Sequence, residues 1–115
     1  MLPPGEGFLL SLARAVLRKP AVLIIEEPAE ELSDDIKNLL DDTYQRLIKP
    51  DRTVIFLPSR LATLRRADQV VLLHQGKVAV IGPQAKLVKE SGLYRHWEYI
   101  KFNEFRHEFD PSSQA

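Results

Sequence analysis

The sequence predicts an α/β fold in which parallel strands alternate with crossover helices and an antiparallel hairpin lies at one edge. Two observations support this prediction. Short unbroken apolar runs rich in β-branched residues alternate with longer stretches whose apolar residues recur at helical spacing, which is typical of strands joined by crossover helices. In addition, Gln75-Gly76 separates the last two apolar runs, and glycine tolerates the positive φ that a two-residue hairpin turn requires.

The first half of the chain contains two predicted helices and two predicted strands. Apolar residues recur at helical spacing from Phe8 to Arg18, and Pro20 ends that pattern. Val22 to Ile25 and Thr53 to Leu57 are short apolar runs, which predict strands covered on both faces by helices. The helix between these strands is expected to begin at Ser33, because serine is a favoured N-cap residue.

The helix that follows Ser33 has the features of an amphipathic helix. Asp34 and Asp35 lie favourably against the positive end of the helix dipole, and Pro50 follows the end of the pattern. The buried stripe of this helix is expected to consist of Ile36, Leu39, Leu40, Tyr44, Leu47 and Ile48.

The second half of the chain continues the alternation and adds the hairpin. The predicted elements are a short helix over Arg60 to Arg66, strands over Gln69 to His74 and Lys77 to Ile81, a short helix ending near Lys89 and a last helix beginning near Leu93. Residues 1–107 are expected to form one portion of a domain, and residues 108–115 a polar tail that is disordered from Asp110 onward.

Six of the nine aromatic residues lie in the last 22 positions of the chain. The first interpretation is that they cover the hydrophobic core. The alternative is that they form an adhesive helix for a second protomer or another domain, because exposed apolar patches often mark interfaces. These residues are Tyr94, Trp97, Tyr99, Phe102, Phe105 and Phe109.

The composition excludes several classes of function. The 16 basic and 16 acidic side chains cancel, so a nucleic-acid partner is not expected. The chain has no cysteine, and His74, His96 and His107 have no shared spacing with a carboxylate that would indicate a zinc site. No apolar run reaches the roughly 20 residues of a membrane-spanning helix, and the N-terminus does not resemble a signal peptide. The sequence therefore predicts a soluble chain.

Several segments, in one order, resemble a known family. The chain contains LPPGE, then LARAV, then an apolar strand that ends in Glu-Glu-Pro, then the run from SRLATLRRADQVVLLHQGKVAVIG to GLY. From residue 2 to about residue 98 this resembles the second half of ABC-transporter ATP-binding domains, most closely those of exporters. In that family the corresponding pieces read LSGGQ, LARAL and Asp-Glu-Pro. The resemblance implies the C-terminal part of a P-loop NTPase-like fold.

The segment that matches the family's signature motif differs from that motif at most positions. Family members direct this helix N-terminus at the γ-phosphate of a nucleotide held by the opposite protomer, because unpaired N–H groups and the helix dipole attract anions. Pro3 replaces the serine and has no hydroxyl, and Pro4 replaces a glycine and has no N–H to donate. Gly5 is retained, whereas Glu6 replaces glutamine and would repel a polyphosphate.

The resemblance also implies roles for residues near the ends of two strands. Glu26 matches the aspartate that holds Mg²⁺, and Glu27 matches the glutamate that activates the attacking water. Glu26 is one methylene longer than aspartate, and an equally open interpretation is that both carboxylates are vestigial. Ser33 occupies the position of the aspartate that organises the dimer interface. Ser59 occupies that of the switch histidine, which in the family contacts the γ-phosphate and the counterpart of Glu27. The acidic pairs at 30/31, 34/35 and 41/42 are expected to be solvated surface.

The phosphate-binding loop GxxxxGK[ST] does not occur in the sequence, and the glycines at 5, 7, 76, 82 and 92 cannot form one. The resemblance implies that the intact family uses ATP and Mg²⁺, yet this chain alone is expected to bind neither tightly and to be inactive by itself. It is therefore expected to be a fragment of an ABC transporter ATP-binding subunit, which couples ATP hydrolysis to transport at the cytoplasmic face of the cell membrane.

Four partners are expected on this interpretation: the missing N-terminal half of the ATP-binding domain, a transmembrane domain, a second nucleotide-binding domain, and a second copy of the chain in a plain or swapped dimer. The swapped form is considered because an absent neighbouring strand would leave an open sheet edge. Two alternatives remain open, namely a non-catalytic ABC-like partner and a regulatory interaction module.

Overall fold

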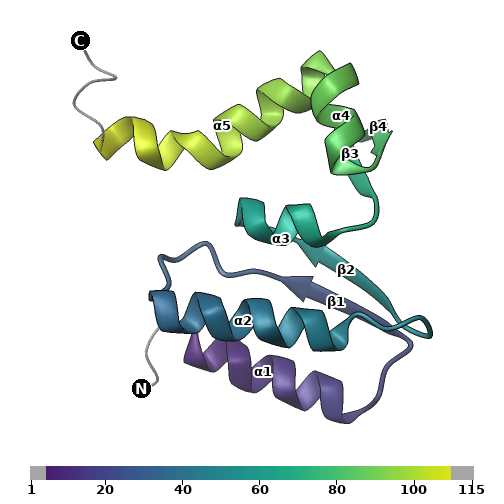
Figure 1. Ribbon diagram of the computed structural model, residues 1–115, viewed down its shortest axis with the longest axis vertical. Coiled ribbons are helices and arrows are strands. Elements are labelled where there is room, and N and C mark those ends of the chain that lie inside the picture. Colours follow the sequence, from purple (N-terminus) through teal and green to yellow (C-terminus); the bar gives the residue numbers. More distant parts are fainter. Residues whose placement is uncertain (1–4, 110–115) are drawn as a thin grey trace. The chain divides into compact units, whose positions relative to one another are not determined.

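The computed structural model of the protein describes the backbone of residues 5–109 and the side chains of residues 5–102 (Figure 1). The chain divides between Ser59 and Arg60 into two compact units, which are described in turn. Pro3, Pro4 and the tail from Asp110, which was expected to be disordered, lie outside the described residues, as do the side chains of Phe105 and Phe109.

The first unit is a parallel strand pair with two helices on one side, as Figure 1 shows. Its elements are α1 (Glu6–Leu17), β1 (Val22–Glu26), α2 (Asp34–Leu47) and β2 (Thr53–Leu57). Strands β1 and β2 are parallel and in register from Val22↔Thr53 to Glu26↔Leu57, with α2 as the crossover between them. The predicted alternation of strand and helix is confirmed here.

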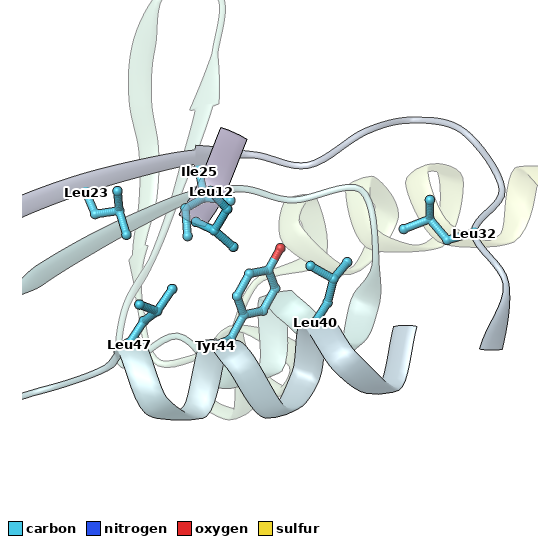
Figure 2. Close-up of a cluster of buried hydrophobic side chains, with 7 residues drawn as sticks. All are labelled: Leu12, Leu23, Ile25, Leu32, Leu40, Tyr44 and Leu47. Atoms are coloured by element: carbon cyan, nitrogen blue, oxygen red, sulfur yellow. The ribbon is translucent and has the colours of Figure 1, made fainter. Parts of the chain in front are cut away.

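The core of the first unit lies between the helices and one face of the strand pair (Figure 2). Each element contributes apolar side chains at the spacing its geometry dictates, every second residue from a strand and every third or fourth from a helix. The buried members are Leu12, Leu23, Ile25, Leu32, Leu40, Tyr44 and Leu47. Helix α2 begins as predicted, because the Ser33 hydroxyl accepts a hydrogen bond from the Ile36 N–H at 3.3 Å.

The prediction that both strands are covered on both faces is wrong. In β1, Leu23 and Ile25 are buried, whereas Val22 and Ile24 are 56% and 64% exposed. In β2 the same alternation leaves Ile55 and Leu57 exposed. The reason is that α1 and α2 supply apolar side chains to the same face of the pair, while the period of two sends alternate residues to the other face.

Two residues of the predicted α2 stripe are exposed, and Ile36 is only partly buried. Leu40, Tyr44 and Leu47 are buried, but Leu39 and Ile48 are exposed. Leu39 lies one residue, or about 100° of helix rotation, from the buried line, and Ile48 follows the last helical residue with an extended backbone. The buried stripe is therefore narrower than the apolar pattern suggested.

The second unit contains an antiparallel hairpin and three helices. Its elements are α3 (Leu61–Arg66), β3 (Val70–His74), β4 (Lys77–Gly82), α4 (Gln84–Glu90) and α5 (Gly92–Phe109). Strands β3 and β4 pair antiparallel around Gln75 and Gly76, whose φ values of 52° and 76° are those of a type I′ turn. The predicted hairpin is thus confirmed. Within the described chain, β1–β2 and β3–β4 each form a sheet of two strands, so the hairpin makes a sheet of its own, whereas the sequence predicted it at one edge of the parallel sheet.

The core of the second unit consists of Leu64, Val70, Leu72, Leu87 and Tyr94, with Trp97 and Phe102 packed against it. Tyr94, Trp97 and Phe102 therefore confirm the interpretation that C-terminal aromatic residues cover the core, whereas Tyr99 is exposed. The hairpin leaves one apolar face exposed, formed by Val71, Leu73, Val78 and Ile81. None of the described helices is long and apolar enough to cross a membrane.

Candidate functional site

The candidate site lies at the carboxyl ends of β1 and β2, in the first unit. Glu26 is the last residue of β1, Glu27 follows it, and Ser59 lies two residues after the end of β2. Because the two strands are parallel, their carboxyl ends meet at the same edge of the sheet, which is where open α/β sheets place their ligand sites.

The Glu27 carboxylate is buried and held at both oxygens. Glu27 is only 6% exposed. Oε2 accepts a hydrogen bond from the Tyr44 hydroxyl at 2.9 Å, and Oε1 accepts one from the Ser59 N–H at 3.0 Å. A buried carboxylate needs donors of this kind to offset the loss of water.

Ser59 meets Glu27 through its main chain. While the Ser59 N–H donates to Glu27, the Ser59 hydroxyl donates to the Pro28 carbonyl oxygen at 2.8 Å. The Glu27 N–H in turn donates to the Leu57 carbonyl oxygen at 3.0 Å. The structure therefore brings Glu27 and Ser59 together, as the resemblance implied, but with the serine side chain directed elsewhere.

Glu26 and Glu27 lie on opposite sides of the chain. Glu26 is exposed and continues the outer face of β1, on which it is paired in register with Leu57. In the part of the chain that the structure describes, no group of three or more His, Asp or Glu side chains is arranged to hold a metal ion. A single carboxylate such as Glu26 is too few ligands for Mg²⁺ by itself. In nucleotide sites, however, one or two carboxylates bind the ion together with phosphates and water.

Gly5, Glu6 and Ser33 lie near the N-termini of the two helices of this unit. Gly5 precedes α1 with a φ of 94°, and a Cβ there would approach Ile36 Cγ2 to 2.8 Å. Glu6 is exposed in the first turn of α1, and the Ser33 hydroxyl is engaged as the cap of α2. The roles in nucleotide contact that the resemblance implies for these residues stay predictions.

Sequence reasoning missed Tyr44 as part of the site. The apolar spacing assigned it to the buried stripe of α2, which is correct for its ring. The signal that was available is the hydroxyl itself, because a buried tyrosine generally finds a hydrogen-bond partner. The sequence does not reveal that the partner is Glu27, 17 residues earlier.

The fold of the chain is similar to that of a region of ABC exporters. The structure superimposes on a solved bacterial Atm1-family ABC exporter with ATP bound, with a TM-score of 0.71 and 28% sequence identity. This match covers 84% of the chain and 17% of the exporter. The mixed architecture of parallel strands and a hairpin is thus shared with that class of protein.

Among curated proteins, the chain is similar to ATP-dependent lipid A-core flippases. It is 35% identical over 103 residues to the flippase of Xanthomonas euvesicatoria and 34% identical over 103 residues to that of Xylella fastidiosa. These matches cover 90% of the chain and 17% of each flippase, so the chain spans about one sixth of the length of these relatives. No protein-family model matches the chain. The chain is therefore a distant homologue of part of these exporters.

Proposed function

We propose that the chain forms the second part of an exporter-like ABC ATP-binding domain and acts only together with a segment that carries a phosphate-binding loop. In that assembly, ATP binding and hydrolysis would be coupled to transport through a transmembrane domain and a second nucleotide-binding domain, at the cytoplasmic face of the membrane. The observation that carries this proposal is the exposed apolar face of the β1–β2 pair.

The outer face of the β1–β2 pair is an exposed apolar surface that a further protein segment can cover. Val22, Ile24, Ile55 and Leu57 expose aliphatic side chains on it, and Ile24 is paired in register with Ile55. Burying the exposed half of each side chain contributes about 1 kcal/mol, so a covering segment would gain about 4 kcal/mol from these four residues. A sheet of two strands also gains stability from further strands or a covering helix.

The roles within the completed site follow from the positions of the carboxylates. Glu26, on the outer face, is the residue proposed to bind Mg²⁺ together with the phosphates of ATP. Glu27 is proposed as the general base, and Gly5, Glu6 and Ser33 as the remains of the surfaces that face a second protomer. The covering segment must supply the phosphate-binding loop, because the chain has no GxxxxGK[ST] sequence.

A chimera tests the proposal. The chain replaces the matched 103 residues of the Xanthomonas euvesicatoria flippase, and Mg-ATP binding is measured by calorimetry for the chimera and for the chain alone. We expect binding by the chimera, no detectable heat for the chain alone, and loss of binding in the chimera with Ile24→Lys. The matched control is Leu17→Lys, since Leu17 is exposed at the end of α1 and away from the outer face. Binding by the chain alone that Glu26→Ala abolishes would overturn the proposal.

A second candidate is a non-catalytic ABC-like partner. It is favoured by Glu26, which stands where the resembled family has aspartate, and by Ser59, which stands where that family has the switch histidine. In this case the chimera binds Mg-ATP, and Glu27→Gln leaves its rate of ATP hydrolysis unchanged, whereas loss of a general base would slow it. A third candidate, a regulatory interaction module, is supported if the chimera does not bind ATP although it folds.

A further inference from the structure

We infer that Tyr44 is a positioning residue of the candidate site: its hydroxyl holds the Glu27 carboxylate against the Ser59 main chain and so fixes both the carboxylate and the loop after β2. The contacts that carry this inference are those of Glu27 with Tyr44 and with the Ser59 N–H. The meaning of the contact for catalysis rests on the proposed function, whereas its effect on the loop does not.

The Tyr44 ring has little freedom to move. The residue is fully buried, and Figure 2 shows it projecting from α2 between Leu40 and Leu47 with its hydroxyl directed away from the helix. The ring also meets Phe56 of β2 edge to face, with centroids 4.9 Å apart. Because close packing fixes the ring, it also fixes the position of the hydroxyl oxygen.

The two donors to Glu27 come from different elements. Tyr44 belongs to α2, whereas Ser59 belongs to the loop after β2. The carboxylate therefore cannot rotate about its last bond without breaking one of two hydrogen bonds, each of which is strengthened by the negative charge. A group that is to remove a proton from water must be oriented within hydrogen-bond reach, and this arrangement sets the orientation of Glu27.

The hydrogen bonds of Glu27 with Tyr44 and Ser59 also hold the loop after β2 in place. Ser59 is linked to Glu27 by its N–H and to Pro28 by its hydroxyl, and Leu57 accepts a hydrogen bond from the Glu27 N–H. The Tyr44 hydroxyl holds the far oxygen of the same carboxylate, so its removal releases the anchor of this loop. A phenylalanine at position 44 fills the same space as the tyrosine ring and removes only the hydroxyl.

Amide hydrogen exchange of Ser59, measured by NMR on the full chain, tests the inference. We expect Tyr44→Phe to accelerate exchange at the Ser59 N–H by roughly 10-fold or more, as loss of a hydrogen bond to a charged group implies. The exchange of the Leu40 N–H, in α2, serves as the internal reference. Tyr94→Phe, which changes the fully buried tyrosine of the second unit, is the matched control and should leave Ser59 unchanged.

An equal acceleration at Ser59 and Leu40 would show that Tyr44 serves only general stability, and no change at Ser59 would also overturn the inference. If Tyr44→Phe does not fold, Glu27→Asp replaces it, because a carboxylate one methylene shorter cannot reach both donors. That variant should accelerate amide exchange at Ser59 and not at Leu40. Unchanged exchange at Ser59 would contradict the inference that Glu27 joins Tyr44 to the loop after β2. The chimera measures the proposed function separately, so failure of ATP binding with a positive exchange result leaves the positioning role intact.

Discussion

At the scale of single residues, Gly5 shows how tightly the start of α1 is packed. Its φ of 94° is disfavoured for other residues, and an added Cβ would come within 2.8 Å of Ile36 and 3.0 Å of Leu32. We expect Gly5→Ala to lower the free energy of unfolding by about 1–3 kcal/mol. Urea denaturation measures the change. Gly7→Ala is the control, since a Cβ there meets nothing within 4 Å, and it should be neutral or stabilising by up to about 1 kcal/mol.

Arg52 joins the segment before β1 to the end of α2, at the edge of the first unit opposite the candidate site. Its Nε donates to the Pro20 carbonyl oxygen at 3.1 Å and its Nη1 to the Leu47 carbonyl oxygen at 3.4 Å. We expect Arg52→Ala to destabilise the chain by about 1–2 kcal/mol, because two carbonyls lose a charged donor. The comparison is with Arg14→Ala on the exposed side of α1, which should stay within about 0.5 kcal/mol of the parent. Equal effects of the two variants in thermal unfolding would contradict the structural role of Arg52.

We expect Tyr94 to make the stability of the chain depend on pH in the alkaline range. Burial, reinforced by the Glu98 carboxylate, raises the pKa of the Tyr94 phenol above its ordinary value of 10.0. The folded state therefore keeps the proton where the unfolded state loses it, so the stabilisation is complete below pH 10 and declines as the pH rises further. Tyr94→Phe should reduce this decline in unfolding experiments above pH 10. Tyr99→Phe, at an exposed position, should not.

The sequence predicts single residues well where the cause is local. The Ser33 cap needs only a hydroxyl and the helix that follows it, and both can be recognised in the sequence. The contact of Glu27 with Tyr44 depends on how α2 packs against β1, so it could not be predicted from spacing. Glu27 and Ser59 were linked through the family resemblance, but which Ser59 atom makes the contact required the structure.

At the scale of elements, the β3–β4 turn gives a direct test of backbone conformation. Gln75 and Gly76 both have positive φ, which asparagine tolerates better than glutamine and glycine better than alanine. We expect Gln75→Asn to stabilise the chain by about 0.5 kcal/mol and Gly76→Ala to destabilise it by about 1 kcal/mol. The melting temperatures of the two variants and of the parent measure these changes. Nothing lies within 4 Å of a Cβ added at Gly76, so a loss of stability in Gly76→Ala comes from the backbone conformation and not from a steric clash. A stabilising Gly76→Ala change would contradict the turn type.

The positions of the elements were predictable, but the faces they bury were not. A short apolar run such as Val22 to Ile25 predicts a strand, and β1 covers it. The run has the same composition whether one face or both are covered, because Val22 and Ile24 are as apolar as Leu23 and Ile25. Only the placement of α1 and α2 on one side of the pair distinguishes the two cases.

At the scale of the whole molecule, each unit exposes an apolar sheet face. Ile24 on β1 and Leu73 on β3 are 64% and 67% exposed. We expect the chain alone to bind the dye ANS, and Ile24→Thr or Leu73→Thr to reduce the fluorescence while the melting temperature changes by less than about 3 °C. Leu17→Thr, at an exposed apolar residue outside both faces, is the control for loss of any aliphatic side chain. Dye binding that is unaffected by all three changes would count against exposed faces as binding surfaces.

The contact of Ser59 with Glu27 has a consequence for how sequences of this kind diverge. Since the main chain makes that contact, every amino acid except proline can supply it at position 59. A search that considers only the side chain at this position would therefore miss the contact, because the donor to Glu27 belongs to the main chain. The identity of the side chain and the geometry of the contact are therefore independent, and a substitution at position 59 can change the first while the second stays the same.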